Sequence, residues 1–358
     1  MGNNFLLIIN PGSTTTKLAC FVNDEQILSE EIEHRSEVLD KFTTIFDQLD
    51  YRLSLIEEKL TDNNVDNSKF TAIVARGGNM KPVSGGTYEI NEEMLSDLKI
   101  GVMGQHASNL GAHLAKKLAE KLDIPCFVVD PVVVDELAPV ARYSGTPLIQ
   151  RKSKDHPLNQ KAVGRIDAHN EGGTYEEMNY IIAHMGGGIS VAAHNHGEII
   201  DVNNALNGDG PFSPERAGGL PVTSVIDLCF SGDYSENELR AVLVGNGGLK
   251  AYLGTTDGRE VSKLINEGDS HAKEVYQAMA YQISKEIGAM ATVLKGQING
   301  ILLTGGLAFD DLLIGYISEY CNFLADIRIY PGENEMVALA AGVNRVMNNE
   351  EKLKKYSQ

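Results

Sequence analysis

The chain has 358 residues, of which 42% are apolar and 22% are charged. This length fits two domains of roughly 150–200 residues better than one, and the composition suffices for full hydrophobic cores. The 49 acidic and 31 basic residues give a net charge of −18, which argues against nucleic acid or an anionic membrane as a partner.

The sequence carries no sign of export or of a membrane anchor. No run of about 20 apolar residues occurs, and no basic-then-apolar leader precedes the strand expected from Phe5. The four cysteines lie far apart and form no C-x-x-C pair, which is typical of reduced thiols in a cytosolic protein. We therefore expect a soluble, cytoplasmic protein.

The first predicted element is a three-stranded meander over residues 5–33. Its first, apolar strand leads into the tetrapeptide Asn10–Ser13, and two further strands follow. Apolar residues at helical spacing then predict a helix over 36–64. A short apolar run over 70–75 predicts a buried strand that ends at Arg76.

The middle of the chain is less regular. Residues 79–105 are rich in glycine and are predicted to be irregular. A leucine stripe predicts a helix over 108–122, and a buried strand over 126–129 ends at Asp130. Residues 135–175 contain a basic segment and then a polar stretch, in which we expect a domain boundary.

The second half of the chain opens with the same architecture as the first. A strand ends at His184, the consecutive glycines Gly186–Gly188 follow, and two further strands complete a second meander. When Gly186 is set against Gly12, the two meanders align at an offset of about half the chain. The pattern therefore predicts two similar domains, 1–176 and 177–335.

The remaining predicted elements alternate between helices and strands. After an aperiodic loop from Asn203 to Pro221, we expect helices over 222–231, 235–244, 259–266, 270–295 and 309–324, strands over 300–303 and 327–330, and a last helix from Glu335. Such alternation is typical of an α/β protein with mostly parallel, doubly wound sheets, here with an antiparallel meander at the start of each half.

Polar residues stand where several predicted strands end, which is where open α/β sheets bind their ligands. They are Asn10, Arg76, Asp130, His184 and the run Thr304-Gly305-Gly306. The chain contains no P-loop and no dinucleotide fingerprint. Anion binding would therefore rest on other glycine-rich turns, whose backbone N–H groups can approach an anion closely.

Two such turns, at Gly12 and at Gly186–Gly188, suit phosphate oxygens. The first adds the hydroxyls of Ser13 and Thr15 and the ammonium of Lys17, whereas the second offers backbone donors alone. Either turn is also compatible with an ordinary hairpin, and Lys17 alternates toward solvent. The occurrence of both turns at corresponding places favours phosphate binding.

Two arginines precede paired glycines, Arg76 after a strand and Arg216 inside the aperiodic loop. Their planar forks match carboxylate or phosphate, and cations beside a transferring phosphoryl group stabilise its charge. A surface salt bridge is the other interpretation of Arg76. The imidazole of His184 could donate to the same phosphoryl group.

Asp130 and Glu335 are the acidic candidates for Mg²⁺, which needs one or two carboxylates when phosphates and waters supply its other ligands. Glu335 suits the first turn of a helix equally well. The triplet at 194–196 has two histidines but no third ligand nearby, so we interpret it as a turn. The sequence has no G-x-S-x-G nucleophile motif.

Four segments carry a family resemblance. They are NPGSTTTK at 10–17, AHMGGGIS at 183–190, GPFSPERAGGLP at 210–221 and LTGGLA at 303–308. Together they resemble the butyrate kinase branch of the acetate kinase family, within the superfamily of actin and the sugar kinases. The likeness extends from residue 5 to about residue 345, and the SPER-x-GGLP loop is its most specific part.

The resemblance implies two actin-like, ribonuclease H-like domains, with mixed sheets flanked by helices, that close on ATP and Mg²⁺ in a cleft between them. It makes the second domain nucleotide-binding and allows the C-terminal segment of about 336–358 to pack back onto the first. The implied reaction is the reversible in-line transfer of a phosphoryl group from ATP to butyrate, which gives ADP and butanoyl phosphate.

The resemblance also assigns roles by position. Asn10 and Ser13 line the first phosphate loop. Arg76 and Arg216 hold the carboxylate and the transferring phosphoryl group, which His184 contacts. The sequence has no kinase-type catalytic Asp motif, which fits an acid acceptor better than a sugar acceptor, because a carboxylate is already ionised near neutral pH.

The same comparison places Asp130 and Glu335 at the magnesium and its water shell, and Gly305–Gly306 along the adenosine. The basic segment departs from the family pattern. The family commonly has an aromatic residue before its histidine, whereas an acidic residue precedes His156, and Gln160 stands where a second histidine is often found. The role of His156 therefore stays open.

Other questions also stay open at the level of sequence. The acid could instead be isobutyrate, propionate or acetate, because the pocket for the alkyl chain cannot be located. A protein of another class, an actin-like nucleotide switch that acts through protein contacts, is disfavoured by the two arginines. Family resemblance favours a homo-oligomer, a dimer or larger, and the apolar stretch 222–230 permits one.

Overall fold

The computed structural model describes residues 3–357, which form two compact units. The first unit joins the residues up to Val134 with those from Asn334 onward. The second unit is the continuous stretch Asp135–Glu333. Each unit has its own sheet and its own hydrophobic core.

The first unit is built from both ends of the chain. Its elements are β1 (Phe5–Pro11), β2 (Thr15–Val22), β3 (Glu25–Glu33), α1 (Ser36–Leu39), α2 (Leu49–Asp62), β4 (Ala72–Ala75), β5 (Thr87–Glu89), α3 (Glu92–Ile100), α4 (Leu110–Leu122), β6 (Cys126–Val129), α12 (Glu335–Met347) and β12 (Lys354–Lys355).

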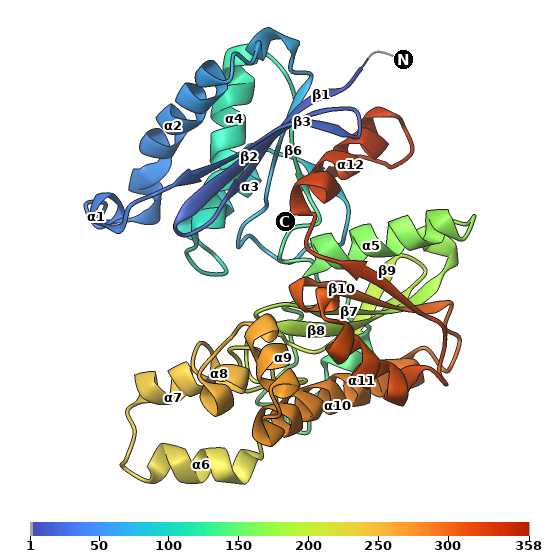
Figure 1. The fold of residues 1–358 in the computed structure, drawn as a ribbon. Coiled ribbons are helices and arrows are strands. Elements are labelled where there is room, and N and C mark those ends of the chain that lie inside the picture. The colour runs from blue at the N-terminus through green and yellow to red at the C-terminus, as the bar shows by residue number, and fades with distance from the viewer. Residues whose placement is uncertain (1–2, 358) are drawn as a thin grey trace. The chain divides into compact units, whose positions relative to one another are not determined.

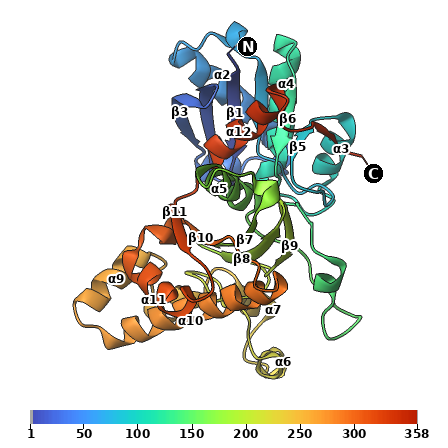
Figure 2. The ribbon, with the colours of Figure 1, turned by 90° about the vertical axis from the view of Figure 1, so that its right-hand side faces the viewer.

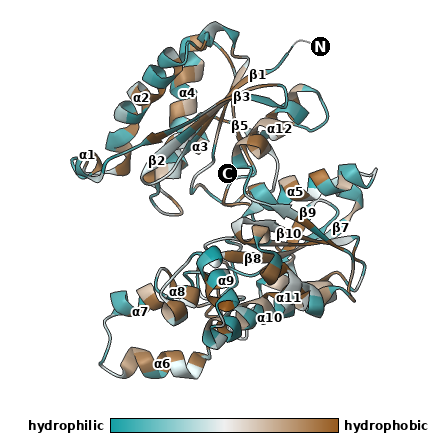
Figure 3. Cartoon of the chain, viewed as in Figure 1, coloured by the Kyte–Doolittle hydropathy of each residue, from teal (hydrophilic) through white to brown (hydrophobic). Residues whose placement is uncertain are grey.

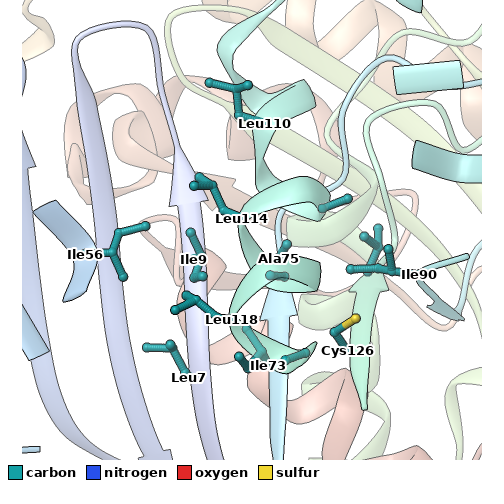
Figure 4. Close-up of a cluster of buried hydrophobic side chains, with 14 of the residues drawn as sticks. Leu7, Ile9, Ile56, Ile73, Ala75, Ile90, Leu110, Leu114, Leu118 and Cys126 are labelled. Carbon is teal, nitrogen blue, oxygen red and sulfur yellow. The ribbon is translucent and has the colours of Figure 1, made fainter. Parts of the chain in front are cut away.

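Its seven strands form one mixed sheet in the order β12-β5-β6-β4-β1-β2-β3. Strands β1, β4 and β6 are parallel neighbours, while β1, β2 and β3 form the antiparallel meander expected from the sequence. Helices α2 and α4 cover one face of the sheet (Figure 1). There Leu7, Ile9 and Ile73 pack among Leu114 and Leu118 (Figure 4).

Helix α12 lies along β1, β4 and β6 (Figure 2). Successive side chains of a strand point to opposite faces of the sheet. Val128 belongs to the core under α4, whereas the neighbouring Val129 faces α12. A Cβ at Gly342 of α12 would come within 2.4 Å of Val129, so the helix approaches the sheet closely. The last long helix therefore covers the second face of the first unit's sheet.

The second unit contains the other long elements. They are α5 (Pro157–Asn170), β7 (Asn179–Met185), β8 (Ile189–Asn195), β9 (Glu198–Val202), α6 (Val222–Phe230), α7 (Glu236–Leu243), α8 (Gly248–Leu253), α9 (Gly258–Asn266), α10 (Ser270–Val293), β10 (Gly300–Gly305), α11 (Asp311–Cys321) and β11 (Ile327–Pro331).

The sheet of the second unit repeats the plan of the first. Its order is β11-β10-β7-β8-β9, with β7, β10 and β11 parallel and with β7, β8 and β9 as an antiparallel meander. Ile181 and Ala183 pack toward α10 and α11, whereas Tyr180 and Ile182 pack toward α5. The duplicated architecture inferred from the two glycine turns is thus present in the fold.

The boundary between the units lies earlier than the one expected at residue 176. Residues 135–176 are grouped with the second unit because they pack on its sheet. The N–H of Ala138 donates to the carbonyl oxygen of Ile200 at 2.9 Å, and α5 packs along β7. The polar stretch at 170–173, in which the sequence predicted a domain boundary, is the surface turn after α5 and lies within the second unit.

Other differences concern single elements. The helix expected over 36–64 is interrupted, because residues 40–44 leave the helix between α1 and the short 3-10 helix at Ile45–Gln48. The segment 79–105 contains β5 and α3, and α5 and α8 were not expected. No helix within residues 3–357 is long and apolar enough to cross a membrane.

Candidate active site

At the ends of β1 and β4, Asn10 and Arg76 contact the same carboxylate. Nδ2 of Asn10 donates to Oε2 of Glu335 at 2.8 Å, and Arg76 forms an ion pair with Oε1 of Glu335. The two strands are parallel neighbours, and Glu335 is the first residue of α12, which packs on them. The fold thus brings together three residues that the sequence singled out.

The turn after β1 is held by a buried arginine that sequence reasoning missed. Arg52 of α2 is fully buried and donates to the carbonyl oxygens of Gly12, Ser13 and Thr15 at 2.9, 3.1 and 3.2 Å. Burial lowers the pKa of Arg52 to about 10, so its guanidinium remains charged at neutral pH. These hydrogen bonds fix the shape of the turn, on which Ser13 is exposed.

Lys17 and Asp130, the other predicted residues of the first unit, have different surroundings. Lys17 is exposed on β2, in register with Asn10. Asp130 is only 1% exposed and has a φ of 36°; its Oδ1 accepts from the N–H of Gly86 at 2.6 Å. Within residues 3–357, no group of three or more His, Cys, Asp or Glu side chains could hold a metal ion.

In the second unit, His184 lies near the end of β7 with 1% of its surface exposed. Its Nδ1 is 2.8 Å from Oδ1 of Asn159, and its ring stacks on His156 with centroids 3.8 Å apart. Nε2 lies 3.0 Å from Oε1 of Glu333, within ion-pair distance. This contact does not have hydrogen-bond geometry, and the buried Nε2 has no hydrogen-bond partner among the described residues.

The glycine turn 186–188 is closely packed, tightly at Gly186 and without room for a side chain at Gly188. A Cβ on Gly186 would lie 3.0 Å from Oε1 of Glu333 and 3.3 Å from Nε2 of His184. A Cβ on Gly188 would lie 1.7 Å from NH1 of Arg216. A histidine, a glutamate and an arginine thus converge on the turn, and Gly188 leaves the space that Arg216 occupies.

Arg216 is fixed beside this turn. Its NH1 donates to the carbonyl oxygen of Ala205 at 2.6 Å, while its buried Nε has no partner among the described residues. Burial lowers the pKa of Arg216 and the nearby Glu215 raises it, but a guanidinium keeps its charge near neutral pH. Nε of Arg216 and Nε2 of His184 are thus buried nitrogens without a hydrogen-bond partner among the described residues, and both side chains lie beside one glycine turn. An anion at the turn would satisfy both of them when His184 is protonated at Nε2.

The same turn opens into a cavity of about 1270 Å³ within the second unit. Its lining includes the glycines Gly186, Gly187 and Gly306 and the polar residues Asp257, Arg259 and Lys263. Small-molecule sites in proteins usually measure several hundred to about 1,000 Å³. The cavity is therefore large enough for a nucleotide whose phosphates lie at the glycine turn.

The run Thr304–Gly306 at the end of β10 contributes to this region in two ways. Thr304 is fully buried, and a Cβ on Gly305 would lie 2.4 Å from the carbonyl oxygen of Met185. These two residues let β10 approach β7. Gly306 lines the cavity, and a Cβ there would meet no atom within 4 Å.

Relatives of known name match along the whole chain. A model of the Acetokinase family matches residues 155–318. Butyrate kinase 2 of Clostridium acetobutylicum is 50% identical over 351 residues, which cover 98% of this chain and 99% of the relative. A probable butyrate kinase of Listeria welshimeri is 51% identical with the same coverage.

The chain belongs to the acetokinase family.

Solved structures extend this likeness to the fold. The acetate kinase of Porphyromonas gingivalis superposes with a TM-score of 0.75 at 16% identity, covering 96% of this chain and 100% of the other. A propionate kinase from Francisella tularensis gives 0.71 at 18% identity, covering 95% and 98%. The predicted actin-like α/β fold, with mixed sheets flanked by helices, is confirmed for this acetokinase-family chain.

Several residues of this acetokinase-family site had no signal of their own in the sequence. Glu333 stood in a Pro-Gly turn, and Asn159 stood in a segment where no helix was expected. Arg52 looked like one of many charged residues on an amphipathic helix. Asp257 and Arg259 begin α9, where an acidic N-cap is ordinary. Only the spatial arrangement separates these residues from their neighbours.

Proposed function

We propose that the chain transfers the γ-phosphoryl group of ATP reversibly to butyrate, giving ADP and butanoyl phosphate. The observation that carries this proposal is identity of about 50% to butyrate kinases over nearly the full length of both chains. The similarity extends over both units and all four motif segments, and it is a similarity of sequence as well as of fold.

The proposed reaction needs charge stabilisation more than proton transfer. A carboxylate oxygen of butyrate attacks the γ-phosphorus in line, and the bond from that phosphorus to the bridging oxygen of ADP breaks. The acid is ionised near neutral pH, so no base has to remove a proton. Both reactants are anionic, and positive groups around the transferring phosphoryl group therefore lower the barrier.

The residues of the second unit are suited to this task. We assign the nucleotide to the cavity, with its phosphates at Gly186–Gly188 and its adenosine side near Gly305–Gly306. The nitrogens of His184 and Arg216 that lack a hydrogen-bond partner among the described residues are assigned to the transferring phosphoryl group. Thr304 supports this region through the hydrogen bond from its hydroxyl to the carbonyl oxygen of Gly332 at 3.3 Å.

In the first unit we assign Arg76 to the carboxylate of the acid and the turn Gly12–Thr15 to phosphate oxygens. Arg76 already holds a carboxylate, that of Glu335, which supports its affinity for such a group. Lys17 is exposed on the neighbouring strand and adds positive charge there.

Of the two acidic candidates, the partly exposed Glu335 suits the water shell of magnesium better than the buried Asp130. Glu335 is partly exposed beside Asn10, whereas the buried Asp130 accepts the N–H of Gly86. One or two carboxylates suffice for Mg²⁺ when phosphates and waters complete its octahedron. When bound with ATP, the ion would neutralise phosphate charge.

A hydroxamate assay tests the activity. ATP, Mg²⁺ and each straight or branched acid from two to five carbons are incubated with the protein, and hydroxylamine traps the acyl phosphate. We expect the highest kcat/KM for butyrate, since one methylene in an apolar pocket changes binding by about 1–3 kcal/mol. ATP hydrolysis that no added carboxylate stimulates would contradict the proposal and would favour a nucleotide switch.

We also propose a cytoplasmic homo-oligomer in which α6 is covered by a second copy. All residues of α6 except the half-buried Val225 are exposed, with Phe230 at 86% and Val222 at 71%. The helix is largely hydrophobic (Figure 3). A helix so apolar is normally buried. Light scattering should give a dimer or larger, and Phe230→Glu with Val222→Glu should shift it toward monomer. An unchanged mass would argue against α6 as the contact.

A further inference from the structure

A chain of hydrogen bonds runs through the core of the second unit to the ring stacked on His184. The hydroxyl of Tyr175 is 2.6 Å from Nδ1 of His194, and Nε2 of His194 is 3.0 Å from Oε1 of Gln160. Nε2 of Gln160 is 2.8 Å from the hydroxyl of Ser190, which is 2.8 Å from Nδ1 of His156. His194, Gln160 and Ser190 are fully buried.

The direction of this chain is fixed by one backbone carbonyl. Nε2 of Gln160 also lies 3.3 Å from the carbonyl oxygen of Ser190, which can only accept. The amide therefore presents its NH₂ to Ser190 and its oxygen to His194. Burial lowers the pKa of His194 well below its usual range, so this ring is neutral. It donates from Nε2 to Gln160 and accepts at Nδ1 from Tyr175.

The same reasoning sets the protonation of His156. The Ser190 hydroxyl accepts from Gln160, and we infer that it donates its own hydrogen to Nδ1 of His156, which lies 2.8 Å away. A ring that accepts at Nδ1 is neutral and carries its proton on Nε2. A change of pH cannot reverse the hydrogen bond from Gln160 to Ser190, because an amide does not titrate in this range. A histidine at position 160 could both donate and accept there, depending on its protonation.

His156 in turn lies against His184. The two rings are nearly parallel, with an interplanar angle of 13° and centroids 3.8 Å apart. Two positively charged rings at this separation would repel each other strongly. The carboxylate of Glu333 lies 3.0 Å from Nε2 of His184, on the side of the pair that faces the glycine turn. A positive charge on His156 would therefore oppose any positive charge on the ring stacked against it.

We propose that Gln160 and Ser190 are positioning residues that keep His156 neutral, so that no positive charge is stacked against His184 beside the glycine turn. The inference rests on the proposed role of His184 in phosphoryl transfer. The titratable or charged groups that surround the histidine pair on the neighbouring elements are Asp155, Lys161 with Glu136, His194, Glu333, and Arg216 with Glu215. Burial raises the pKa of Asp155 to about 7.

Nitrogen NMR of the full chain labelled with ¹⁵N-histidine tests the protonation directly. The signal of His156 is identified by its loss in His156→Phe. We expect an unprotonated Nδ1 and a protonated Nε2 that persist as the pH is lowered. In Ser190→Ala, which removes the hydroxyl donor, His156 should gain a proton at higher pH. A protonated Nδ1 in the wild type, or identical titration in the two proteins, would overturn the proposal.

Kinetics then test the consequence for transfer. In Ser190→Ala the acid limb of kcat should move up by about one pH unit, because a charged His156 opposes the charge on His184. Ser190→Thr, which keeps the hydroxyl, should restore the wild-type profile. The double variant Ser190→Ala/His156→Phe should do so too, because its stacked ring cannot titrate. Coinciding acid limbs in wild type and Ser190→Ala would refute the positioning role.

Two controls separate the possible failures. Circular dichroism and thermal unfolding establish whether Ser190→Ala is folded. If this variant does not fold, the protonation of Nδ1 of His156 in the wild type still decides the proposal. If the chain lacks kinase activity altogether, the proposed function fails while the NMR experiment still decides the protonation of His156.

Discussion

Oε1 of Glu333 lies 3.0 Å from Nε2 of His184, so a carboxylate stands beside the glycine turn to which we assign the phosphates. This carboxylate acts on the two steps of the reaction in opposite directions. It repels an incoming anionic nucleotide, and it lies within ion-pair distance of the His184 ring when that ring is protonated.

Glu333→Gln should therefore lower KM for ATP several-fold and lower kcat by about tenfold. Steady-state kinetics at varied ATP checks both constants. Glu319→Gln, on the outer surface of α11, is a matched loss of one negative charge and should change neither. A higher KM in Glu333→Gln would mean that Glu333 helps to bind the nucleotide instead.

Arg216→Ala should reduce kcat by about 10²–10³-fold, because a preorganised cation at the transferring group is removed. The dissociation constant for ATP, measured by calorimetry, should change far less. Arg216→Lys should recover little activity, since an ammonium cannot present the same planar fork. Equal losses in turnover and in ATP binding would remove the proposed role in transfer.

Gly188→Ala should displace the guanidinium of Arg216, because the added Cβ would lie 1.7 Å from NH1. We expect a fall in kcat that approaches that of Arg216→Ala. Gly315→Ala provides a comparison within a helix, where a Cβ meets no atom within 4 Å. That substitution should raise the thermal midpoint slightly and leave kcat unchanged. Normal turnover in Gly188→Ala would show that the turn can widen.

The stability of the first unit should fall in mild acid because of His34. Burial, and secondarily the charge of Arg52, lowers the pKa of His34 to about 4. The unfolded chain gains this proton near pH 6.5, so unfolding is favoured progressively as the pH falls from about 6.5 to about 4. The contribution is at most about 2–3 kcal/mol.

His34→Gln should flatten this dependence. Urea unfolding of the wild type and the variant at pH 7 and at pH 4.5 gives the difference that His34 causes. Carboxylates also titrate in this range, but they do so in both proteins. A difference that does not change with pH would exclude His34 as the cause.

The strand ends were predictable because the rule that places ligands there depends only on strand order and burial. Asn10, Arg76 and His184 follow apolar runs, and parallel pairing brings such ends together. The two glycine turns revealed the duplication because a turn of this kind needs glycine for close approach. The long helices α4 and α10 followed from apolar spacing that a single buried face imposes.

The residues that contact the strand-end side chains and the glycine turns could not be predicted from the sequence. α5 carries buried polar residues on one face, such as Gln160 and Lys161, so its apolar periodicity is weak. Because α5 was not predicted, its residue Asn159, whose Oδ1 contacts Nδ1 of His184, was not singled out either. Glu333 and Arg52 act through contacts with residues far away in the sequence, and no spacing rule connects them.

The discontinuity of the first unit has a consequence for the order of folding. A ribosome synthesises Asp135–Glu333 before α12, so the second unit precedes the helix that completes the first. Until the last residues emerge, the sheet of the first unit lacks the helix that covers one of its faces. The apolar face formed by β1, β4 and β6 therefore cannot be covered by α12 until synthesis has passed the whole second unit.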